Sequence, residues 1–191
     1  MTTIAPEHPR LTSQNWAGHW HGFGPWVGPP EHYAKEGSKR PPHPVQPGPD
    51  SDHANRYREA AGEFASGNLP PLMTGHWLMK RGQAEASRTW TDVTDAVAWL
   101  RGHYTRNLPF ERSDGLQAYA ELDVKVAYVY DVLPRGVDVT WVHYTESRSL
   151  FSAAVVCCPN LFHPDTPCPL KASSMRSPDV ARSAVAPGWG S

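Results

Sequence analysis

Two segments in the last third of the chain decide the fold class: VDVTWVHYT (137–145) and LFSAAVVCC (150–158). In the first segment apolar and polar side chains alternate, so Val137, Trp141 and His143 share one face of a strand. In the second segment nearly every residue is apolar, which is typical of a strand buried on both faces. The sequence therefore predicts two adjacent antiparallel strands in the protein core.

Working outward from these strands, the same periodicities predict further elements. The segment AYAELDVKVAYVY (118–130) alternates and is expected to be a third strand of the same meander. Additional strands are predicted over 16–23, 72–81 and 88–90, and helices over 51–66 and 92–104, the second one capped by Thr91. The expected fold class is α+β, or all-β with inserted helices, with an antiparallel sheet that could close into a β-barrel.

The length of 191 residues fits one domain, which we expect to span residues 1–160. Eight prolines between Pro25 and Pro49 predict a long irregular excursion within it, because proline lacks the amide donor that helices and sheets need. Residues 161–191 show no periodicity and are expected to form an extended or mobile tail.

Composition excludes several classes of function. A formal net charge of −1 gives no basic excess for nucleic-acid phosphates. No apolar run approaches the ~20 residues of a membrane span, and residues 1–10 lack the apolar region of a secretory signal. We therefore expect a cytoplasmic protein that meets a small molecule rather than nucleic acid or a membrane. Nucleotide-binding glycine loops, hydrolase elbows and zincin motifs are also missing.

The three cysteines, Cys157, Cys158 and Cys168, are an odd number and do not suggest a disulfide framework. Their Cys-Cys-x9-Cys spacing differs from the common zinc patterns. The spacing favours an interpretation as buried or incidental thiols.

Histidines offer an alternative based on a metal. His19 and His21 share one face of the predicted first strand, with side chains about 6–7 Å apart, so they could present two imidazoles to one ion. His76, on another predicted strand, could be a third ligand. A transition metal or haem is therefore an alternative to a protein without a cofactor, and ordinary core or surface histidines are the other interpretation.

The stretch WAGHW (16–20) resembles the opening of calycin-type barrels, the lipocalins, fatty-acid-binding proteins and nitrobindin-like proteins. The resemblance implies that Gly18 and Trp20 have structural roles, that the barrel holds a small apolar ligand, and, from the nitrobindin-like members, that it could hold haem. The chain departs from this pattern in its proline-rich excursion and in offering only six or seven predicted strands.

The inward face of the predicted meander suggests a site. His143, Tyr128 and Tyr130 are the candidate catalytic residues, because an imidazole and a phenol in an apolar pocket can move protons near neutral pH. Trp20 and Trp141 are the candidate ligand-binding residues. We expect a small cofactor-independent enzyme (a cyclase, isomerase or lyase) acting on an apolar or aromatic metabolite, as in secondary metabolism. The alternatives are a haem- or metal-dependent enzyme and a non-catalytic carrier of a hydrophobic ligand.

Overall fold

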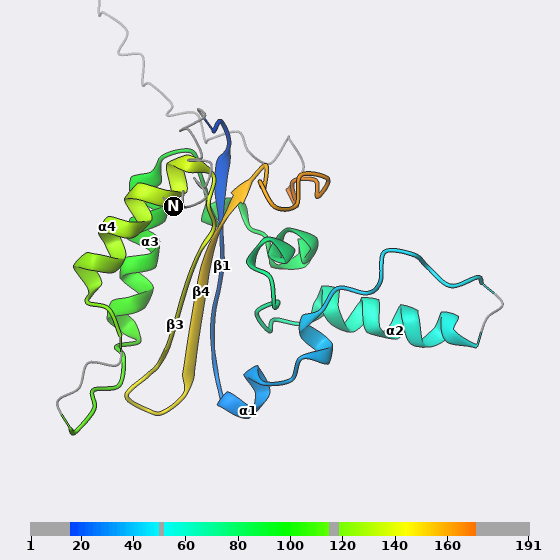
Figure 1. The fold of residues 1–191 in the computed structure, drawn as a ribbon, viewed down its shortest axis with the longest axis horizontal. Helices are drawn as coiled ribbons and strands as arrows, with labels where there is room; N and C mark the ends of the chain where they lie inside the picture. The colour runs from blue at the N-terminus through cyan, green and yellow to red at the C-terminus, as the bar shows by residue number, and fades with distance from the viewer. Residues whose placement is uncertain (1–15, 50–51, 115–118, 171–191) are drawn as a thin grey trace, which may run out of the picture.

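The computed structural model describes residues 16–49, 52–114 and 119–170. Its centre is an antiparallel four-stranded sheet in the order β2-β1-β4-β3 (Figure 1). The strands are β1 (His19–Gly28), β2 (Thr89–Trp90), β3 (Val139–Tyr144) and β4 (Leu150–Cys158). Since β2 and β3 form its two edges, the described sheet is open, and the fold class is α+β.

The two strands that the sequence marks most clearly, β3 and β4, are confirmed. The residues of β3 alternate between buried and exposed, as expected at an edge with one covered face. β4 lies between β1 and β3, and every one of its residues is buried, which explains why its sequence is apolar throughout.

Two helices, α3 (Val93–Arg106) and α4 (Leu122–Val132), cover one face of the sheet (Figure 1). The α3 prediction is confirmed, although its N-cap is Asp92, whose carboxylate accepts the Thr94 amide, and not Thr91. Side chains from both helices meet Trp20, Trp141, Phe151 and Val155 in the larger hydrophobic core.

The strand predicted over 118–130 is wrong: most of that segment is the helix α4, and Ala118 lies outside the described residues. Apolar residues occur at both periods here, so alternation alone was ambiguous. The helical stripe that includes Leu122, Val126 and Val129 packs on the larger core. The alternating set includes Val124 and Tyr128, which the helix leaves exposed.

The opposite face of the sheet carries the 3₁₀ helix η2 (Thr74–Met79), where the sequence predicted a strand over 72–81. This prediction is wrong because the segment crosses the sheet face instead of joining an edge. Trp77 stacks on Phe23 of β1 with ring centroids 5.1 Å apart, and Leu78 packs in the same smaller core. The short strand predicted near residues 88–90 exists as β2 but pairs with β1.

β1 extends through Pro25 to Gly28, so the proline-rich excursion begins inside a strand. Its pairing with β4 shifts register between Phe23 and Trp26, where Gly24 adopts a positive φ of 89°. Beyond β1 the excursion includes α1 (Pro30–Tyr33) and the 3₁₀ helix η1 (Gly37–Lys39).

The predicted helix near 51–66 is confirmed as α2 (His53–Ser66), with Ser51 outside the described residues. Three further 3₁₀ turns connect the elements: η3 (Arg81–Gln83), η4 (Ala86–Arg88) and η5 (Leu133–Arg135). None of the helices in the described part of the chain is long and apolar enough to cross a bilayer.

Of the predicted tail, residues 161–170 are described and residues 171–191 are not. The described part follows β4 and returns to the sheet on the η2 side, where Cys168 lies beside His19 and His21 of β1. This return brings together residues that are far apart in the sequence.

Candidate metal centre

On the sheet face that η2 covers, the side chains of His19, His21 and Cys158 converge at the end of β4. Successive side chains of a strand point to opposite faces, so Trp20 enters the helix-side core while His19 and His21 face η2. Cys158 is the cross-strand partner of His19. Its neighbour Cys157 points the other way, into the larger core.

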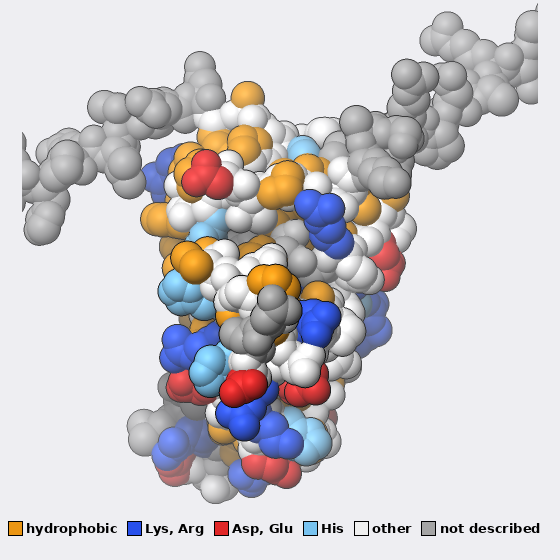
Figure 2. All heavy atoms as spheres, turned by 90° about the vertical axis from the view of Figure 1, so that its right-hand side faces the viewer, with side chains coloured by type: hydrophobic (Ala, Val, Ile, Leu, Met, Phe, Trp, Pro, Cys, Tyr) orange, Lys and Arg blue, Asp and Glu red, His pale blue; other side chains and the backbone are white. Residues whose placement is uncertain are grey.

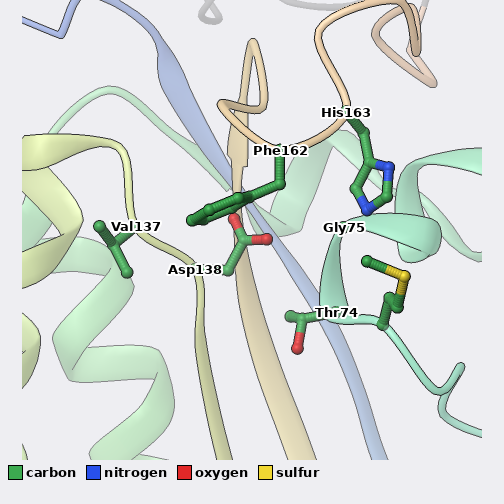
Figure 3. A pocket seen from close by; sticks show the side chains of 7 residues that line it. Thr74, Gly75, Val137, Asp138, Phe162 and His163 are labelled. Carbon is green, nitrogen blue, oxygen red and sulfur yellow. The ribbon is translucent and has the colours of Figure 1, made fainter.

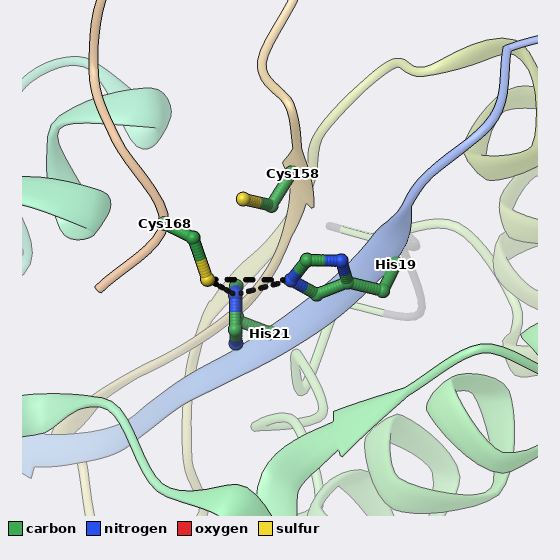
Figure 4. Close-up of side chains that lie close together, drawn as sticks. All are labelled: His19, His21, Cys158 and Cys168. Atoms are coloured by element: carbon green, nitrogen blue, oxygen red, sulfur yellow. Dashed lines mark hydrogen bonds between the residues drawn. The ribbon is translucent and has the colours of Figure 1, made fainter. Parts of the chain in front are cut away.

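Cys168 completes the group from the returning segment (Figure 4). Its Sγ lies 3.5 Å from Nε2 of His19 and 3.5 Å from Nε2 of His21, and the two Nε2 atoms are 3.0 Å apart. The ligand atoms of His19, His21, Cys158 and Cys168 all lie within 4.8 Å of one another. Four donor atoms of types that bind soft or borderline metals therefore meet at one point.

The surroundings favour neutral imidazoles at this point. Burial, and next the nearby His19, lower the pKa of His21 to about 4. Burial likewise lowers the pKa of His19. A neutral imidazole keeps a lone pair for a metal, whereas an imidazolium has none.

The surroundings make the Cys158 thiol harder to ionise, because burial and the adjacent Cys168 raise its pKa to about 12. Metal binding to this cysteine must displace the thiol proton.

A hydrogen bond to Thr89 also orients the His21 ring. Its Nδ1 lies 2.8 Å from Oγ1 of Thr89, and this hydroxyl donates to the Glu85 carbonyl at 2.9 Å. Because the hydroxyl proton is used on Glu85, the Thr89 oxygen accepts from Nδ1–H of His21. This assigns the tautomer in which Nε2 carries the lone pair, and Nε2 is the atom directed at Cys168. Hydrogen bonds of this kind typically fix metal-binding histidines.

Asn160 anchors the start of the segment that carries Cys168, through contacts that do not involve the candidate metal ligands. The side-chain oxygen of Asn160 accepts the amides of Phe162 and His163 at 3.0 and 3.1 Å, and its Nδ2 donates to Asp138. These contacts fix the direction of the chain after β4. Further along this segment, the His163 ring lies against His76 and Cys168 lies beside His19 and His21.

The structure separates the residues predicted to form an acid–base site. His143 is 7% exposed, with Nε2 2.6 Å from the Asn107 carbonyl oxygen and its ring stacked on Phe151. Tyr128 and Tyr130 lie on α4 and are 56% and 42% exposed.

Trp20 and Trp141, the predicted ligand-binding residues, are both buried members of the helix-side core. The Tyr104 ring makes T-shaped contacts with the rings of both Trp141 and His143. Burial of the imidazole is the main cause lowering the pKa of His143.

The predicted histidine set is partly assembled. His19 and His21 meet as expected, but His76 lies on η2 and its ring pairs with that of His163, with centroids 4.5 Å apart. The positions that sequence reasoning missed are Cys158 and Cys168. Their spacing matches no zinc motif because the two histidines that complete the set lie more than 130 residues earlier, on a neighbouring strand. The available signal was a His-x-His pair in a chain with adjacent cysteines.

Comparisons with protein-family models, with curated proteins and with solved structures find no match. The functional argument therefore depends on this site and its surroundings.

Proposed function

We propose that this chain binds one zinc ion through His19, His21, Cys158 and Cys168. The observation that carries the proposal is the convergence of these ligand atoms within 4.8 Å of one another. In a tetrahedral zinc site, neighbouring nitrogens are about 3.3 Å apart and a nitrogen and a sulfur about 3.6 Å. The separations that join His19, His21 and Cys168, 3.0 and 3.5 Å, are close to these edges, and the Cys158 sulfur lies within 4.8 Å of the other ligand atoms.

The ligand set supports a structural role for the ion. Catalytic zinc sites keep a position for water or substrate, whereas two histidines and two cysteines fill all four tetrahedral positions. Here the ion would connect β1, the end of β4 and the returning segment, and thereby hold residues 159–168 against the sheet.

Elemental analysis of the purified full-length protein tests the proposal. We expect one zinc per chain, and loading with Co²⁺ should give thiolate-to-cobalt charge-transfer absorption. Cys158→Ala and Cys168→Ala should each lose the metal. Cys157→Ala is the matched control, because this neighbouring buried thiol lies on the other face of the sheet. A protein that holds no zinc and takes up no cobalt would contradict the proposal, as would equal metal loss in Cys157→Ala.

The earlier expectations remain as further candidates. Haem would be held by one of His19, His21 and His76, and the visible spectrum of the purified protein distinguishes it from zinc. A calycin-like carrier would need a closed barrel, whereas the described sheet has two edges.

The cofactor-independent acid–base enzyme is the second candidate. It is favoured by one observation, the buried Nδ1 of His143, which has no hydrogen-bond partner among the described residues. His143→Gln separates a catalytic from a structural role: the former loses turnover, the latter lowers Tm and leaves turnover intact.

A further inference from the structure

A cavity of about 260 Å³ lies on the η2 side of the sheet (Figure 3). One wall comes from the start of η2, with Met73, Thr74 and Gly75. Val137 and Asp138, which precede β3, form the floor, and Phe162 and His163 form the other wall. None of the proposed metal ligands lines this cavity.

The polar group at its floor is a carboxylate with neutral partners. Asp138 accepts the amide of Cys157 at 2.8 Å, and both of its oxygens accept from Nδ2 of Asn160, at 2.9 and 2.8 Å. Asp138 takes part in none of the ion pairs found in residues 16–49, 52–114 and 119–170. A half-buried carboxylate therefore faces the cavity without an ion pair to a lysine or arginine in the described part of the chain, and His163 is the titratable group nearby.

The walls offer apolar and aromatic contacts. Phe162 and Met73 are 69% and 51% exposed, although residues of this size and type are usually covered. Figure 2, viewed from this side of the molecule, shows apolar side chains mostly in the upper half of the face, among a few charged ones, and most of the charged side chains below.

Contacts within the protein fix the backbone on both sides of the cavity. Asn160 fixes the amides of Phe162 and His163. A side chain at Gly75 would lie 2.3 Å from the His163 ring, so this glycine is what lets the two walls approach. The wall is therefore positioned before any ligand arrives.

We infer that this cavity binds a small organic cation with an apolar body, placing its ammonium group on Asp138 and its apolar part between Phe162 and Met73. An ammonium can donate to the carboxylate lone pairs that Asn160 leaves free, and an aromatic wall adds cation–π attraction. The inference rests on the proposed metal site in one respect only: Cys168 would hold the far end of the segment that carries Phe162 and His163.

The test titrates the full-length, metal-loaded protein with benzylammonium chloride and with benzyl alcohol, its neutral counterpart. Binding is followed by calorimetry and by amide shifts of residues 73–75, 137–138 and 162–163. We expect benzylammonium to bind at least tenfold more tightly than the alcohol. Asp138→Asn should abolish this preference, because asparagine keeps an oxygen for the Cys157 and Asn160 donors but removes the charge.

Two variants accompany the test. Asp123→Asn removes an exposed carboxylate on α4 and should leave the preference unchanged. Phe162→Ala, at an exposed position that the fold does not need, should weaken binding of both compounds. Equal binding of amine and alcohol, or a preference that survives Asp138→Asn, would overturn the inference. Zinc is measured in the same samples. A protein that holds zinc but does not prefer benzylammonium contradicts the cation site and leaves the zinc proposal standing. A protein that prefers benzylammonium but holds no zinc contradicts the zinc proposal and leaves the cation site standing.

Discussion

At the scale of single residues, the decisive contact is the one behind His21. A metal-binding histidine that can rotate, or that carries its proton on the wrong nitrogen, binds weakly. At the proposed ligand His21, the Thr89 hydroxyl opposes both. This arrangement also accounts for a polar residue in the short strand β2, whose register places Thr89 opposite His21.

Replacement of Thr89 by valine keeps the shape of the side chain and removes the hydrogen-bond acceptor. We expect zinc affinity, measured by competition with a chromophoric chelator, to fall roughly 10- to 100-fold. Thr140→Val is the control, because that hydroxyl bonds to Thr74 and to none of the metal ligands. Equal affinities of Thr89→Val and the parent protein would show that Thr89 does not position His21.

At the scale of elements, a buried lysine connects η2 to α2. Lys80 is fully buried, and its Nζ donates to the carbonyls of Phe64 and Gly67 at the C-terminal end of α2. The carbonyl ends of a helix attract a cation, and the Phe64 ring lies 4.3 Å from the ammonium. Burial nevertheless lowers the pKa of Lys80 from 10.5 to about 8.

This lowered pKa predicts a pH dependence of stability. Between pH 8 and 10.5 the unfolded chain holds the lysine proton and the folded chain releases it, so the unfolded state binds more protons. The free energy of unfolding should therefore rise with pH in this window, by up to about 3 kcal/mol. Below pH 8 both states are protonated, and this contribution does not change.

Denaturant unfolding of the parent protein and of Lys80→Met, followed from pH 7 to 10.5, measures the effect. The variant matches the length of lysine without its charge, and the difference between the two pH profiles isolates Lys80. Parallel profiles would contradict the assignment.

The elements also show where sequence patterns suffice. β3, α2 and α3 were predictable because burial on one side gives each a single period, and β4 was predictable because it is apolar throughout. α4 was not, since Leu122 to Val132 contains apolar residues at both periods, and packing on the larger core selects the helix. In the metal site the His-x-His half was visible on one strand. The cysteine half depends on the pairing of β1 with β4 and on the return of Cys168, neither of which is a local property.

At the scale of the whole molecule, the two faces of the sheet are stabilised differently. The helix-side face has a continuous apolar core under α3 and α4. The η2-side face has a smaller core, which Cys158 and Cys168 join at the candidate metal centre. Removal of zinc should therefore affect one side of the sheet and leave the other folded.

Hydrogen exchange of the zinc-loaded and the chelator-treated protein tests this asymmetry. We expect amides of residues 159–168 to lose protection on chelation, while α3 and α4 keep theirs and the helical circular dichroism is unchanged. Tm should fall, because zinc at 1,000 times its Kd contributes about 4 kcal/mol to the folded state. Uniform loss of protection through α3 would show that the two faces unfold together, against this prediction.

The central pairing of β1 with β4 has a consequence for biosynthesis. Of the described strands β1 is synthesised first, yet its long partner begins only at Leu150, and its other neighbour, β2, is two residues long. The edge of β1 that β4 covers therefore stays unpaired until the hairpin of β3 and β4 has been synthesised. The nascent chain thus exposes Trp20, Phe23 and Trp26 until β4 has been synthesised, and it is during that interval that a chaperone would have the most to protect.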